Sequence, residues 1–149
     1  MESNEARDAL AQVSAARARM TAIVADCPPW RHAVFGAVSF MLIGSVAISN
    51  GVQIAASPVI LLAVFLIVRS DRARMGVFVN GYRRGATLPI SLAMLAAMIG
   101  LVFGAMELRL GGYGLVAKIL LAALAFVIAT LFSIYWQRIY LLELQARAR

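Results

Sequence analysis

Three stretches of this chain contain no aspartate, glutamate, lysine or arginine, and they limit what it can fold into. They cover residues 32–68, 85–106 and 119–137, and are 37, 22 and 19 residues long. A helix needs about 20 apolar residues to cross the hydrocarbon core of a bilayer, which is about 30 Å thick. The second and third stretches therefore each predict one membrane-spanning helix.

The first stretch is too long for one crossing, because a helix of that length would extend about 55 Å. Its only polar cluster lies at residues 49–53 and contains the turn-forming pair Asn50-Gly51. We expect two short helices joined by a tight turn there, with a bend at Pro58 in the second. The predicted fold is an all-α, polytopic integral membrane protein with four transmembrane helices. The expected spans are about 32–49, 52–68, 86–106 and 115–137.

The composition favours the same class of protein. Hydrophobic residues make up 62% and charged residues 14% of the 149 residues, against about 45–50% and about 25% in soluble domains. The single cysteine excludes a disulfide scaffold. A net charge of +7 would raise nucleic acid as a partner of a soluble chain. Here the basic residues flank the spans, so we expect no nucleic-acid partner.

Lysine and arginine are divided unequally between the two ends of the expected spans. Twelve lie before the first span, between the second and third, or after the fourth, whereas only Arg109 and Lys118 lie at the other end. Cytoplasmic segments of membrane proteins are enriched in these residues. The bias therefore predicts that both termini are cytoplasmic.

The segments outside the membrane are also predicted to be helical. Residues 1–27 are expected to form a cytosolic amphipathic helix with apolar residues at heptad-like spacing, which Pro28 and Pro29 end. Residues 28–149 then form the transmembrane bundle, whose fourth span continues as a cytosolic helical tail over 138–149. The apolar stripe of this tail is expected to pack on the N-terminal helix or on an apolar patch at residues 75–79.

Three groups of residues are candidates for contacts. Small residues four apart on the third span let two backbones approach closely, either inside the bundle, which we favour, or at a dimer seam. The loop after the second span carries two basic clusters, which ordinary positive-inside signalling explains or which bind anionic headgroups or a partner. Amphipathic rings and cations at span ends anchor the helices at the interface. These groups are, in order, Ala96, Gly100 and Gly104; Arg72, Arg74, Tyr82, Arg83 and Arg84; and Trp30, Arg31, His32 and Trp136.

The sequence offers no pattern typical of a catalytic, cofactor or metal site. His32 and Cys27 are the only residues of their kinds, and a metal site needs several ligands. We therefore predict no enzyme, no cofactor and a non-enzymatic membrane interaction protein: an accessory, assembly or regulatory subunit that binds itself or a membrane-protein partner. The alternative is a small-molecule or lipid transporter of the small four-span type, which normally needs an intramembrane acid. An enzyme acting on lipid headgroups is a third option, but no general acid or base accompanies the arginines.

Two local patterns also resemble a known group of proteins. They are Pro29-Trp30-Arg31-His32 and the segment 76–84, Gly-Val-Phe-Val-Asn-Gly-Tyr-Arg-Arg. Together they resemble uncharacterised small bacterial membrane proteins with four spans. The resemblance implies a multi-pass protein of the bacterial cytoplasmic (inner) membrane, and it implies no catalytic residue.

Overall fold

The computed structural model describes residues 2–75 and 85–146, and this part of the chain is helical without any strand. Its five helices are α1 (Glu2–Ala25), α2 (Pro29–Ile48), α3 (Asn50–Met75), α4 (Leu88–Leu110) and α5 (Leu115–Ala146). Helices α2 to α5 are long and apolar enough to cross a membrane. The all-helical class and the four candidate spans are therefore confirmed.

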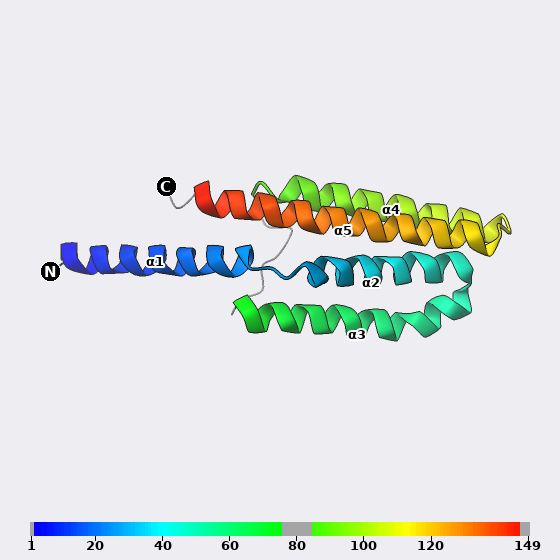
Figure 1. Ribbon diagram of the computed structural model, residues 1–149, viewed down its shortest axis with the longest axis horizontal. Coiled ribbons are helices and arrows are strands. Elements are labelled where there is room, and N and C mark those ends of the chain that lie inside the picture. Colours follow the sequence, from blue (N-terminus) through cyan, green and yellow to red (C-terminus); the bar gives the residue numbers. More distant parts are fainter. Residues whose placement is uncertain (1, 76–84, 147–149) are drawn as a thin grey trace.

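The four apolar helices form a bundle in which α2 is central. It packs against α3, α4 and α5, and α4 also packs against α5. Among the described residues the backbone of α3 packs against no spanning helix except α2, and a side-chain hydrogen bond joins the start of α3 to α4. The helices alternate in direction, so the chain termini lie together at one end, the terminal end, and the α2–α3 and α4–α5 connections lie at the other, the turn end (Figure 1).

The buried core lies where α2, α4 and α5 meet. It consists of Ile43, Val46 and Ala47 from α2, Leu101 and Ala105 from α4, and Ala125 from α5. Large apolar side chains elsewhere on the spans are exposed, including Leu61, Phe103 and Leu120 at 64–68%. Such a surface is typical of helices surrounded by lipid rather than water.

The chain reverses between α2 and α3 at a single residue, Ser49. Its hydroxyl accepts a hydrogen bond from the Val52 N–H at 3.2 Å, as an N-cap residue does. Asn50 and Gly51, which we expected to form the turn, already belong to the first turn of α3. The cap at Ser49 explains why the reversal is tighter than predicted.

Helix α3 is longer than the expected second span. The sequence predicted an interfacial loop from Arg69, but the helix continues to Met75. No glycine or proline interrupts it between Pro58 and that point, so nothing in the sequence ends it. Proline at position 58 removes one backbone hydrogen bond, and α3 is bent in the part of the helix that begins at Asn50 (Figure 1).

The connection from α4 to α5 is a short glycine turn. Gly112 has a φ of +66°, a conformation that glycine adopts without strain. The N–H of Gly111 donates to the Glu107 carbonyl at 2.8 Å, and the N–H of Tyr113 donates to the Leu108 carbonyl at 3.1 Å. These bonds satisfy carbonyls at the end of α4 and return the chain along it.

Helices α1 and α5 both extend at the terminal end. α5 continues without a break past Gln137 to Ala146, and α1 runs on from the bundle roughly along its long axis (Figure 1). Near its base α1 contacts α5 and α3, and Val24 and Tyr140 are buried there. Leu10 and Val13 on the projecting part are 69% and 47% exposed.

Candidate functional site

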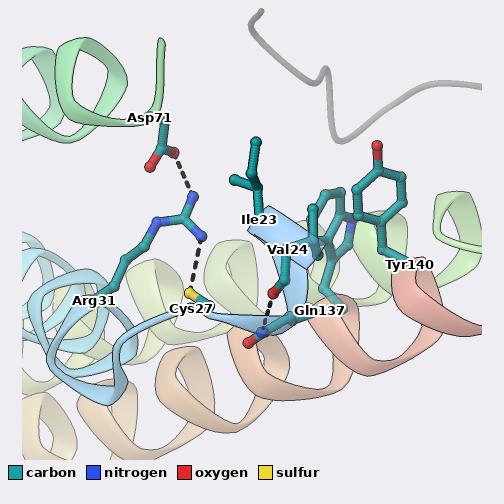
Figure 2. A pocket seen from close by; sticks show the side chains of 8 residues that line it. Ile23, Val24, Cys27, Arg31, Asp71, Gln137 and Tyr140 are labelled. Carbon is teal, nitrogen blue, oxygen red and sulfur yellow. Dashed lines mark hydrogen bonds and ion pairs between the residues drawn. The ribbon is translucent and has the colours of Figure 1, made fainter. Parts of the chain in front are cut away.

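Polar side chains gather at the terminal end, where α1, α2, α3 and α5 meet. The linker between α1 and α2 sets their positions. Pro28 is extended, with φ −67° and ψ 138°, and Pro29 begins α2, where the missing N–H of proline has no helical partner to lose. Cys27 therefore lies in the linker and Arg31 in the first turn of α2 (Figure 2). We call this region the polar junction.

Arg31 connects three segments of the chain. Its Nη2 forms an ion pair with Oδ2 of Asp71 on α3, and its Nη1 donates a hydrogen bond to Cys27 Sγ at 3.5 Å (Figure 2). The two charged side chains are only 29% and 12% exposed. They lie near the ends of their spans, where a charge costs less than at the membrane centre and is screened less than in bulk water.

His32 ties α2 to α5. Its Nδ1 and the hydroxyl of Ser133 share a hydrogen bond of 2.8 Å, and the Thr130 hydroxyl donates to the His32 carbonyl at 3.5 Å. We expected His32 to lie among lipid headgroups, but it is 7% exposed. A buried imidazole needs a hydrogen-bond partner, and Ser133 supplies one.

Gln137 ties α5 to the base of α1. Its side-chain amide donates to the Val24 carbonyl at 2.8 Å (Figure 2). This carbonyl belongs to the last turn of α1, where no N–H further along the helix is available. Beside it, Trp136 and Tyr140 of the same helix stack with their ring centroids 5.1 Å apart. Both rings line the polar junction next to Gln137.

A small pocket lies inside the polar junction. It has a volume of about 30 Å³ and is lined by Cys27 of the linker and by residues from all four helices, among them Val24, Arg31, Asp71 and Gln137 (Figure 2). Ligand pockets are typically about 300–1,000 Å³, and one water needs about 10–15 Å³. The pocket therefore has room for about two waters and none for an organic substrate. Among the described residues no three metal-binding side chains lie together.

The predicted interfacial anchors fall into two kinds. Trp30 is 56% exposed and lies at the first turn of α2, as an interfacial ring does. Arg31 and His32 instead bond to side chains of other helices, and Trp136 stacks on Tyr140 of its own helix and lines the pocket. The sequence analysis named all four residues, but it did not pair Arg31 with Asp71 or His32 with Ser133, and it did not single out Gln137.

The small residues of α4 do not pack inside the chain in the way we favoured. Ala96 and Gly100 are exposed, and a Cβ added at Gly100 would meet no atom of the described residues within 4 Å. Only Gly104 faces a neighbour, since a Cβ there would lie 3.7 Å from Leu121 of α5. Most of this pattern is therefore open to the surroundings of the protein.

Close backbone packing occurs instead between α2 and α5. A Cβ at Gly36 would lie 2.3 Å from Thr130 Oγ1 and 2.9 Å from the Phe126 carbonyl oxygen. A Cβ at Gly44 would lie 3.5 Å from that of Ala122. Ala122 of α5 thus faces α2 at this position. The eight-residue spacing of these two glycines was a signal that the sequence analysis did not use.

The basic loop is described only at its edges. Arg72 is exposed on the last turns of α3. The side chain of Arg74, together with Tyr82, Arg83 and Arg84, lies outside the described residues. At the turn end, Arg109 donates from Nη1 to Asn50 Oδ1 at 2.6 Å, which ties α4 to the start of α3.

Comparison with known proteins gave no relative. The chain has no significant match among protein-family models, curated proteins or solved structures.

Proposed function

We propose that this chain is a non-enzymatic interaction protein of the bacterial cytoplasmic membrane, which associates with itself through the open face of α4. Both termini lie in the cytoplasm in this proposal. Association with a different membrane protein, as an accessory, assembly or regulatory subunit, is the related form of the same function. The fold contributes four candidate membrane spans and an extension built from α1 and the end of α5, which is cytosolic in this proposal.

One observation carries the proposal: the Ala96 and Gly100 part of the small-residue pattern of α4 is not packed against any other described part of the chain. Gly100 has open space where a side chain would be, and Ala96 one turn earlier is exposed. In lipid, helices associate by close van der Waals packing, and small residues four apart permit it. A second helix can approach the α4 backbone here more closely than at any large side chain.

The charge distribution supports the orientation and the lipid partner. The terminal end carries the arginine-rich segments, whereas the turn end carries Arg109 and Lys118. Exposed arginines near an anionic leaflet each contribute about 1 kcal/mol of attraction. Arg72 and the neighbouring basic loop, with Arg74, Tyr82, Arg83 and Arg84, are the residues we assign to anionic headgroups.

The test is the stoichiometry of the purified protein in lipid. Single-molecule photobleaching of labelled protein in nanodiscs should show two or more copies per particle. The variant Gly100→Ile should shift the population to one copy, because its side chain fills the space of the second helix. Ala55→Ile, on the exposed surface of α3, is the matched control and should behave as wild type. A wild-type protein with one copy per particle in both detergent and nanodiscs contradicts self-association.

A further inference from the structure

Helix α3 is held less firmly than the other three spanning helices. Among the described residues it packs only on α2 and on the base of α1. Between Gln53 and Ile67 its half-buried residues recur every three or four positions and form one narrow face, as in a two-helix seam. This face comprises Gln53, Ala56, Ile60, Ala63 and Ile67, and ends at Asp71, the one buried residue of the described part of α3.

The two ends of α3 are secured differently. At the turn end, Ser49 joins α3 covalently to α2, and the Asn50 side chain accepts the hydrogen bond from Arg109. At the terminal end the nine residues 76–84 separate Met75 from Gly85, the next described residue. There the ion pair between Asp71 and Arg31 ties it to α2.

We propose that the Arg31–Asp71 ion pair is a latch, and that α3 pivots away from α2 about the Ser49 turn when the pair is broken. The apolar face of α3 does little to hold this helix on α2, since none of the apolar residues of the face is buried. Lipid solvates an apolar helix face as well as α2 does. An ion pair at the membrane boundary is directional and is either formed or broken. It therefore gives α3 two positions rather than a continuous range.

The latch also connects α3 to the cytosolic helix. The same Arg31 guanidinium that holds Asp71 donates to Cys27 in the linker between α1 and α2. A force on α1 that displaces this linker acts on the group that secures α3. This inference concerns contacts within one chain and does not depend on self-association through α4.

The test measures the position of α3 by pulsed electron spin resonance between two spin labels. All variants carry Cys27→Ser, which removes the single cysteine and keeps an acceptor for Arg31. One label pair, at Ala73 and Leu142, reports the terminal ends of α3 and α5; the other, at Val52 and Val116, reports their turn ends. All four positions are exposed. Asp71→Asn should lengthen and broaden the first distance and leave the second unchanged.

Two further variants separate the latch from a general loss of structure. Arg31→Asp combined with Asp71→Arg should restore the original distance at the terminal end. Arg31→Lys, which keeps the charge but loses the planar fork, should give a terminal-end distance distribution between those of wild type and Asp71→Asn. This variant replaces Asp71→Asn in the test if Asp71→Asn does not yield a monodisperse protein. An unchanged terminal-end distance in Asp71→Asn and Arg31→Lys overturns the proposal. A change of both distances together, or no restoration by the reversed pair, also overturns it.

Discussion

His32 and Ser133 hold the two most extensively packed helices together by a hydrogen bond of 2.8 Å between Nδ1 and Oγ. One turn away on α5, Thr130 donates to the His32 backbone carbonyl at 3.5 Å, and its hydroxyl also lies against Gly36. The same face of α5 thus makes a polar contact with His32 and, one turn away, packs closely against the backbone of α2 at Gly36. These contacts fix α5 against α2 at the terminal end of the core, so their loss should be measurable as a loss of stability.

Removing the hydroxyl of Ser133 should destabilise the bundle through His32. Ser133→Ala leaves a buried imidazole nitrogen without its partner, which costs about 1–3 kcal/mol. In a double-mutant cycle with His32→Ala the two effects should be strongly non-additive, measured as unfolding free energy in mixed micelles. Ser57→Ala is the control, since that hydroxyl is exposed and bonds only to its own helix. Additive effects of the two substitutions would contradict the contact.

Adding one methyl group at Gly36 should disrupt the packing of α2 on α5. The Cβ would overlap Thr130 Oγ1 and approach the Phe126 carbonyl oxygen, and such overpacking costs about 1–3 kcal/mol. A lower melting temperature in detergent is the expected result for Gly36→Ala. Gly100→Ala places the same methyl group in open space on another helix and should leave the melting temperature of the single chain unchanged. Equal effects of the two substitutions would refute the difference in packing.

Breaking the bond from Gln137 should loosen α1 while the spans stay packed. Gln137→Leu keeps much of the side-chain volume and removes the donor to the Val24 carbonyl. Hydrogen–deuterium exchange measured by mass spectrometry should then rise in peptides that cover the second half of α1. Peptides covering the core of α2 serve as the internal reference and should exchange as in wild type. Unchanged protection of α1 would show that this bond does not secure the helix.

The two tryptophans should respond differently to truncation. Trp136 stacks on Tyr140 and lines the polar junction, so Trp136→Ala should cost about 3 kcal/mol or more. Trp30 is 56% exposed at the start of α2, and Trp30→Ala should change the unfolding free energy by less than about 1 kcal/mol. Thermal unfolding followed by circular dichroism in the same detergent compares them. A larger loss at Trp30 than at Trp136 would contradict the structure.

The spans could be predicted because the bilayer imposes a simple requirement on the sequence, a run of about 20 residues without charge. The ends of the helices were harder to predict, since no breaker follows Arg69 until Gly76 and α3 simply continues. The turn was misplaced because Asn50-Gly51 is a strong turn signal, whereas the serine before it provides a helix cap.

Pairing between helices depends on distances that a linear sequence does not contain. Counting outward from Ser49 along the two helices, Ile67 lies opposite Arg31, and Asp71 is one helical turn further. The length of the arginine side chain covers that turn. The ion pair could therefore have been anticipated once the turn was fixed at Ser49. The hydrogen bonds that α5 makes could not have been anticipated, because the rotation of α5 about its axis is set by close packing at Gly36 and Gly44.

In the proposed topology four helices cross the membrane and leave both ends of the chain in the cytoplasm. Reporter fusions in living bacterial cells test this topology, with alkaline phosphatase active only outside the cytoplasm and green fluorescent protein fluorescent only inside it. Fluorescent protein at either terminus should fluoresce, and phosphatase inserted at Gly112 in the turn between α4 and α5 should be active. Phosphatase activity at either terminus, or fluorescence from an insertion at Gly112, would contradict this topology.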